Sequence, residues 1–168
     1  AVNGLAGRVH CSKSAVAAES GVRTFHVAES SAFSGLSDTG RSLIRERIDV
    51  QCVALDEFEA LAGRTVDLMK IDVEGAEFEV LTGASALIDR SPQLIVQFEA
   101  TRKNLDASGL KRLMLWMQQQ RQSGYVVRVG AAEASPGSVL EATDQLDSCR
   151  SGNLYLMRSG GDAERRVH

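Results

Sequence analysis

Apolar and polar residues alternate in three stretches of the first third of the chain, at 8–16, 22–27 and 47–53. A period of two is typical of strands that bury one face, so each stretch is predicted to be a strand. Gly21 separates the first two stretches, which we expect to form a loose hairpin. Residues 29–40 are rich in serine and glycine and have little periodicity, so they are predicted to form a loop.

The rest of the chain alternates short apolar runs with stretches of helical periodicity. Two nearly continuous apolar runs, 66–73 and 93–99, are predicted to be parallel strands covered on both faces. Apolar residues recur every three or four positions in three stretches that are predicted to be helices: 55–61, 76–89 and 108–123. Two further strands are predicted, with an irregular segment between them: 125–129 and 153–157, separated by 130–152.

This order of elements predicts an α/β fold, because strands that alternate with helices form parallel sheets with right-handed crossovers. No helix is expected between the last two strands, so one of them is predicted to run antiparallel. The 168 residues are enough for one domain with a real core. We expect that domain to cover residues 1–159 and to be followed by a disordered tail, 160–168.

Composition and charge narrow the class of protein. The net charge of -3 and the lack of a basic stripe argue against a nucleic-acid partner. No apolar run approaches the roughly 20 residues of a membrane span, and the N-terminus lacks the pattern of a secretory signal. The three cysteines, Cys11, Cys52 and Cys149, are far apart and have no zinc-binding spacing. We therefore expect a cytoplasmic protein with reduced thiols and no membrane partner.

Candidate chemistry lies where the two buried runs end. Asp72 follows the first run, Glu74 and Glu77 come in the next turn, and Glu99 ends the second run. Ligands of open parallel sheets bind outside the carboxyl ends of the strands, and neighbouring strands lie about 4.8 Å apart. If the two strands are neighbours, Asp72 and Glu99 are expected to face one cleft.

These carboxylates have structural as well as functional interpretations. Glu74 and Glu77 begin a predicted helix, where acidic residues are favoured whatever the function. A charge such as Asp72 at the end of a buried strand is costly unless it is paired or used, and its obvious partner is Lys70. Gly75 at the start of a helix indicates a close approach of backbone or ligand. A carboxylate here could accept a proton from a hydroxyl, hold an ammonium group or join a divalent metal site.

The motif DLMKIDVEGAE at 67–77, with VLTGA at 80–84 and LIVQFE at 94–99, resembles the FkbM family of S-adenosylmethionine-dependent methyltransferases. The segment VALDEF at 53–58 and the closing strand NLYLM at 153–157 resemble further parts of that family. Altogether the resemblance covers roughly Asn3 to Arg158. It implies a Rossmann-like class I methyltransferase sheet that is mostly parallel, with an antiparallel strand near the C-terminus.

The resemblance also implies an activity, the transfer of a methyl group from S-adenosylmethionine to a hydroxyl of a sugar, polyketide or other small molecule. By that analogy Asp72 lies beside the transferring methyl and the incoming hydroxyl and contacts the cofactor. Glu74 and Glu99 line the substrate side. Five further residues are placed near the cofactor: Ser14, Ala15, Val16, Ser31 and Ser34.

The sequence departs from the family's pattern on its N-terminal side. The glycine-rich turn after the family's first strand, and the acidic residue that ends the second, are not found in it. We therefore expect the first two strands of the sheet to be absent, cofactor binding to be weak or lost, and exposed edges to favour a homo-oligomer. Two other classes stay open: a non-catalytic interaction module that keeps this scaffold, and a metal-dependent hydrolase using Asp72, Glu74 and Glu99.

Overall fold

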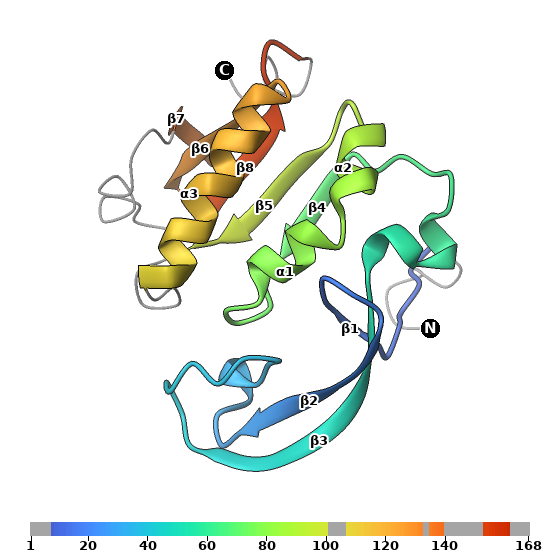
Figure 1. Ribbon diagram of the computed structural model, residues 1–168, viewed down its shortest axis with the longest axis vertical. Helices are drawn as coiled ribbons and strands as arrows, with labels where there is room; N and C mark the ends of the chain where they lie inside the picture. The colour runs from blue at the N-terminus through green and yellow to red at the C-terminus, as the bar shows by residue number, and fades with distance from the viewer. Residues whose placement is uncertain (1–7, 101–106, 133–134, 140–152, 162–168) are drawn as a thin grey trace.

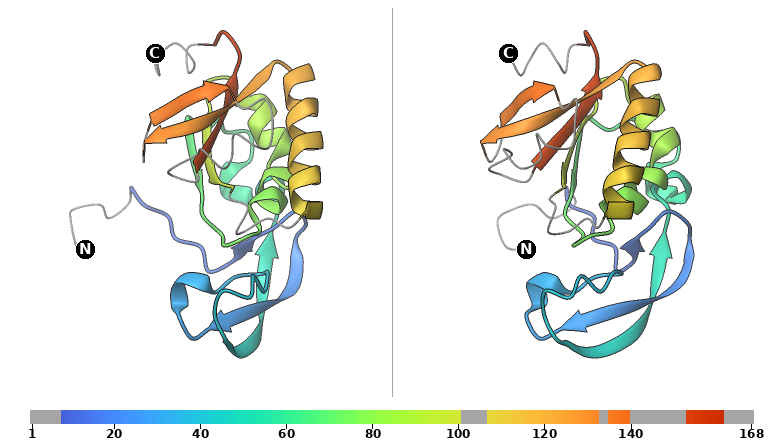
Figure 2. Two further views of the ribbon diagram at one scale, coloured as in Figure 1. Left: turned by 90° about the vertical axis from the view of Figure 1, so that its left-hand side faces the viewer. Right: turned by 60° about the vertical axis from the view of Figure 1, so that its left-hand side comes forward.

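Two β-sheets and one layer of helices make up the computed structural model, which describes residues 8–100, 107–132, 135–139 and 153–161. Figure 1 shows three α-helices packed on one face of a five-stranded sheet, with a smaller three-stranded sheet beyond the end of β4. Two views from the side show that all three helices lie on the same face of the larger sheet (Figure 2). No helix in the described ranges has the length and apolarity needed to cross a membrane.

The small sheet has the order β1-β3-β2. β2 (Gly21–Ala28) pairs antiparallel with β3 (Ile44–Val53), and β1 (Ala15–Val16) pairs parallel with the other edge of β3. The predicted hairpin between residues 8–16 and 22–27 is therefore wrong, since the hairpin joins β2 to β3 across the long loop. Residues 8–14 alternate in sequence but enter no ladder, and alternation without paired backbone does not make a strand.

The large sheet has the order β4-β5-β8-β6-β7. Its strands have these bounds: β4 Leu68–Ile71, β5 Ile95–Glu99, β6 Tyr125–Ala132, β7 Ser135–Val139 and β8 Asn153–Arg158. Only β4 and β5 pair in parallel, while the other three neighbouring pairs are antiparallel. The antiparallel strand near the C-terminus is confirmed. The expectation of a mostly parallel sheet is corrected, because β8 inserts between β5 and β6 and pairs with both.

Residues 135–139, expected to be irregular, form β7, and the rest of the predicted irregular segment, 133–134 and 140–152, lies outside the described residues. Of the predicted tail, residues 162–168 also lie outside them.

The helices are α1 (Glu77–Thr82), α2 (Ser85–Arg90) and α3 (Ala107–Gln122). The last agrees with the prediction, but the single helix expected at 76–89 is two helices that meet at Gly83. The expected helix at 55–61 is a pair of short 3₁₀ turns. One of these turns presents Asp56, whose carboxylate accepts the backbone N–H groups of Ala86 and Leu87 at 2.9 and 2.7 Å. Asp56 therefore caps α2 from outside the helix.

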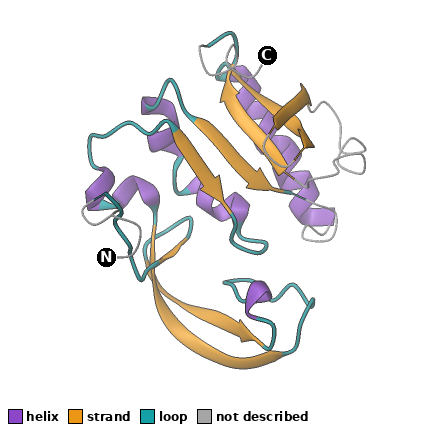
Figure 3. Cartoon of the chain, turned by 180° about the vertical axis from the view of Figure 1, so that it is seen from behind, coloured by secondary structure: helices purple, strands orange, loops and turns teal. Residues whose placement is uncertain are grey.

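The main core lies between the helices and one face of the large sheet. Its fully buried side chains include Leu81 of α1, Phe98 of β5, Met117 of α3 and Leu154 of β8. The opposite face of β4 is uncovered in the described chain, with Leu68 65% exposed, so the prediction that both faces are covered is wrong for this strand. Figure 3 views the sheet from that side, with the helices behind the strands.

Candidate functional site

The turn after β4 has an unusual backbone. Glu74 has a φ of 51° and Gly75 a φ of 98°, so two successive residues lie in the left-handed region and lead the chain into α1. A residue other than glycine in this region costs about 1–2 kcal/mol. Such a turn persists only where surrounding contacts determine it.

Glu77 supplies those contacts. The residue is 4% exposed, and its carboxylate accepts the backbone N–H of Gly75 at 3.1 and 3.2 Å and that of Val73 at 3.3 Å. Burial raises the pKa of Glu77, the backbone hydrogen bonds act in the opposite direction, and the charge of Glu99 raises it further. Glu77 was expected to be mainly a favourable charge at a helix start. In the structure it is a buried clamp on the acidic turn, residues 72–76.

Glu74 is bound by the loop between β2 and β3. Its carboxylate, 20% exposed, accepts a hydrogen bond at 2.9 Å from Arg41, whose guanidinium lies 4.2 Å above the ring of Phe33. Gly35, which stands between Phe33 and Arg41 in the same loop, lies against the acidic turn. A Cβ at this position would be 3.3 Å from the carbonyl oxygen of Val73. The loop between β2 and β3 therefore contacts the acidic turn through the Arg41–Glu74 ion pair and the close approach of Gly35.

Asp72 directly follows β4, at the carboxyl end of the strand. Its carboxylate is 54% exposed and accepts a hydrogen bond from Lys70 at 2.7 Å, the structural pairing that the sequence suggested. This hydrogen bond, together with the charges of Asp72 and Glu99, raises the pKa of Lys70. Ile71 stands opposite Phe98 in the parallel ladder, so Asp72 and Glu99 follow at the same edge of the sheet.

Glu99 interacts electrostatically with two groups of charged residues, the Lys70–Asp72 pair and Glu77. Its charge acts on Lys70 beside Asp72 and on the buried Glu77. It is half-buried and lines a pocket of about 70 Å³ that Gly75 and Glu77 also border. Of the three carboxylates that the resemblance assigns to catalysis, Asp72, Glu74 and Glu99, it is the one in the pocket.

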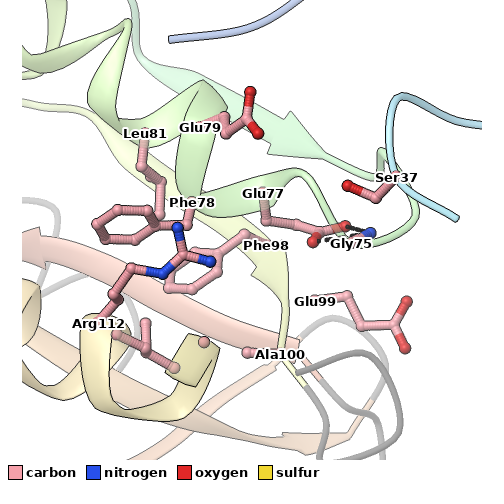
Figure 4. Close-up of a pocket in the computed structure, with 12 residues that line it drawn as sticks. Ser37, Gly75, Glu77, Phe78, Glu79, Leu81, Phe98, Glu99, Ala100 and Arg112 are labelled. Atoms are coloured by element: carbon pink, nitrogen blue, oxygen red, sulfur yellow. Dashed lines mark hydrogen bonds between the residues drawn. The ribbon is translucent and has the colours of Figure 1, made fainter. Parts of the chain in front are cut away.

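The pocket is closed by elements that are distant in sequence (Figure 4). Ser37 comes from the loop over the acidic turn, Phe98 from β5 and Arg112 from α3. Ser37 and Arg112 were not foreseen, since neither belongs to a motif. Within the described chain no group of three or more His, Cys, Asp or Glu side chains is arranged to hold a metal ion.

The residues expected near a cofactor lie on the small sheet and its loop. Ala15 and Val16 form β1 and pack against the cores. Ser34 accepts the backbone N–H of Ala28 at 3.0 Å, Ser31 begins an exposed 3₁₀ turn, and Ser14 precedes β1. None of the five lines the pocket beside Glu99. Their assignment to the cofactor stays a prediction.

The fold and the site define a class of protein, an α/β protein with acidic side chains clustered at the carboxyl ends of neighbouring parallel strands. A family model described as the methyltransferase FkbM domain matches residues 3–127. The chain belongs to this family of methyltransferases, as the motif at 67–77 predicted. No curated protein and no solved structure matches the chain.

Proposed function

We propose that this protein is an S-adenosylmethionine-dependent O-methyltransferase that acts on a hydroxyl of a small molecule, such as a sugar or a polyketide-like compound. Membership of the FkbM family supports methyl transfer. The position of Glu99 supports a hydroxyl acceptor, because this half-buried carboxylate borders a small pocket at the end of β5. That position is the observation on which the proposal depends.

The charge of the site fits the methyl donor, which carries a positive sulfonium and an ammonium group. Asp72, Glu77 and Glu99 form an acidic edge to which such a cation is attracted. The pocket itself holds about five water molecules, counting about 10–15 Å³ for each. We assign this pocket to the reacting end of the acceptor, because Glu99 borders it. The donor is assigned to the open side of the acidic edge, with Asp72, Ser14, Ala15, Val16, Ser31 and Ser34 as its proposed contacts.

When bound, S-adenosylmethionine supplies an electrophilic methyl group. The chain's own contribution is to hold the acceptor hydroxyl in line and to receive its proton. We assign proton acceptance to Glu99, because of Asp72, Glu74 and Glu99 it is the one that lines the pocket. Asp72 is the second candidate for this role, and Glu74 is assigned to the substrate side.

The proposal is tested with the full chain by calorimetric titration of S-adenosylmethionine and by mass spectrometry of a panel of hydroxylated acceptors. Glu99→Gln is expected to lower kcat by about 10²–10⁴-fold, the usual contribution of a general base, while cofactor binding is retained. Asp72→Asn serves as the paired variant and should have the smaller effect on kcat. A folded chain that neither binds S-adenosylmethionine nor methylates any acceptor would refute the proposal and favour the non-catalytic interaction module.

A further inference from the structure

Arg112 is the one cation that borders the acidic pocket in the described chain. It lies on α3, and its guanidinium is 5.6 Å from the centre of the Phe78 ring. The pocket's other charged groups have partners or neighbours of their own: Glu79 pairs with Arg23, and Glu77 binds the backbone of the acidic turn. Among the described residues no carboxylate forms an ion pair with Arg112. Its guanidinium is therefore available to an anionic ligand.

The pocket has carboxylates on one side and a guanidinium with two aromatic rings on the other. Figure 4 shows the carboxylates of Glu77 and Glu99 at one end and the guanidinium of Arg112 at the other, beside the rings of Phe78 and Phe98. A ligand that spans the pocket meets negative charge on the Glu99 side and, on the Arg112 side, positive charge beside an apolar wall. A carboxylate is repelled at the Glu99 end and attracted at the Arg112 end, so charge alone sets the orientation.

We propose that the acceptor is a hydroxy acid whose carboxylate binds Arg112 and whose hydroxyl lies at Glu99. The aromatic rings beside Arg112 contact the part of the apolar spacer next to the carboxylate. Guanidinium groups bind carboxylates through paired N–H bonds, which gives geometric selectivity beyond simple charge. The inference rests on the proposed function in one respect, that Glu99 marks the reacting end.

The chain carries its own reporter of pocket occupancy. Trp116 is the only tryptophan in the sequence, and its ring lies edge-on to Phe78 at 6.4 Å and to Phe98 at 6.1 Å between ring centres. A ligand against these two rings changes the surroundings of the indole. Its fluorescence therefore measures binding without requiring turnover.

The experiment titrates the full chain with short ω-hydroxy carboxylic acids, each paired with its primary amide, and follows the fluorescence of Trp116. The wild type is expected to bind the acids at least about tenfold more tightly than the amides, a difference of about 1.4 kcal/mol. Arg112→Gln should bring the ratio of the amide Kd to the acid Kd close to one, and Arg112→Lys should leave an intermediate ratio. Lys111→Gln is the matched control, because it removes the same charge from the next, exposed residue of α3 outside the pocket. It should keep the full preference.

Three results would overturn the inference: equal binding of acids and amides to the wild type, no binding of any acid in the series, or a full preference in folded Arg112→Gln. Circular dichroism verifies folding, and Arg112→Lys provides the comparison if Arg112→Gln does not fold. Methyl transfer is measured separately. Arg112-dependent acid binding by a chain that neither binds S-adenosylmethionine nor methylates any acceptor supports recognition by Arg112 and overturns the methyltransferase proposal. Transfer to acids and amides alike overturns only the hydroxy-acid inference.

Discussion

Replacing Gly83 with alanine tests how the two sheets are joined. Gly83 lies between α1 and α2 with φ -73° and ψ 0°, a conformation that any residue adopts. The backbone therefore does not require glycine, and alanine by itself would add about 0.4–1 kcal/mol of stability. The requirement is space, because a Cβ at this position would be 2.3 Å from the carbonyl oxygen of Ala17 and 3.1 Å from that of Ala18.

The size of the effect follows from that distance. Cβ atoms essentially never approach other atoms within 3.0 Å, so the backbones must separate by at least 3.0 − 2.3 = 0.7 Å. Ala17 cannot easily yield, since it is fully buried and its N–H donates to the carbonyl of Val53 at 3.1 Å. Overpacking of this kind costs about 1–3 kcal/mol. Subtraction of the alanine gain leaves about 0–2.6 kcal/mol, and we expect Gly83→Ala to lower the free energy of unfolding by about 1.3 kcal/mol, the middle of that range.

The measurement is urea denaturation followed by the fluorescence of Trp116 and by circular dichroism. Thr82→Ala is the control at the neighbouring exposed position and should stay within about 0.5 kcal/mol of the wild type. If Gly83→Ala were as stable as the wild type, or more so, the close approach of Gly83 to Ala17 would not restrain the fold.

Two further predictions concern buried polar groups. Because burial raises the pKa of Glu77 above its ordinary 4.5, its contribution to stability is present below pH 4.5 and is lost as the pH rises through the folded-state pKa. The free energy of unfolding of Glu77→Gln minus that of the wild type should therefore increase as the pH rises from 4.5 through the folded-state pKa. Denaturation at several pH values measures this difference. Glu59→Gln, at an exposed position, is the control, and a pH-independent difference for Glu77→Gln would contradict the assignment. Asp56→Ala removes the cap of α2 and should cost about 0.5–2 kcal/mol. Asp56→Asn, which keeps one acceptor oxygen, should lose about half as much in the same assay, and an Asp56→Ala variant as stable as the wild type would show that the cap is dispensable.

The elements that could be predicted from the sequence are those whose signals are local. α3 and β5 were predicted to within one or two residues, because each carries its own period and ends at a turn. The pairing of β2 with β3 was missed because the partner lies across a long serine-rich loop. The division of the helix at Gly83 was missed because its cause is the distant Ala17. Leu68 was expected to be buried, since an apolar strand does not reveal whether a second layer covers it.

In the candidate site, too, the features with a local sequence signal were predicted and the others were not. Glu99 was predicted from its place at the end of a buried strand, and the pairing of Asp72 with Lys70 was anticipated from their spacing. The hydrogen bonds from the acidic turn to Glu77 were not anticipated, because their donors are N–H groups of a turn whose shape depends on the left-handed Glu74. The spacing of Gly75 two residues before Glu77 is the signal that was available. Arg112 carries no local signal, since only the packing of α3 against β5 brings it to the pocket.

The central place of β8 has a consequence for the order of events during synthesis. β5 and β6 leave the ribosome first, but each pairs with β8 and not with the other. Until residues 153–158 emerge, the nascent chain carries a gap in the middle of its larger sheet, flanked by the apolar residues Val96, Phe98 and Val127. Open strand edges of this kind invite aggregation. β8, the last strand of the described chain, is thus the one that closes the sheet, and a stop before it would expose the core instead of trimming an edge.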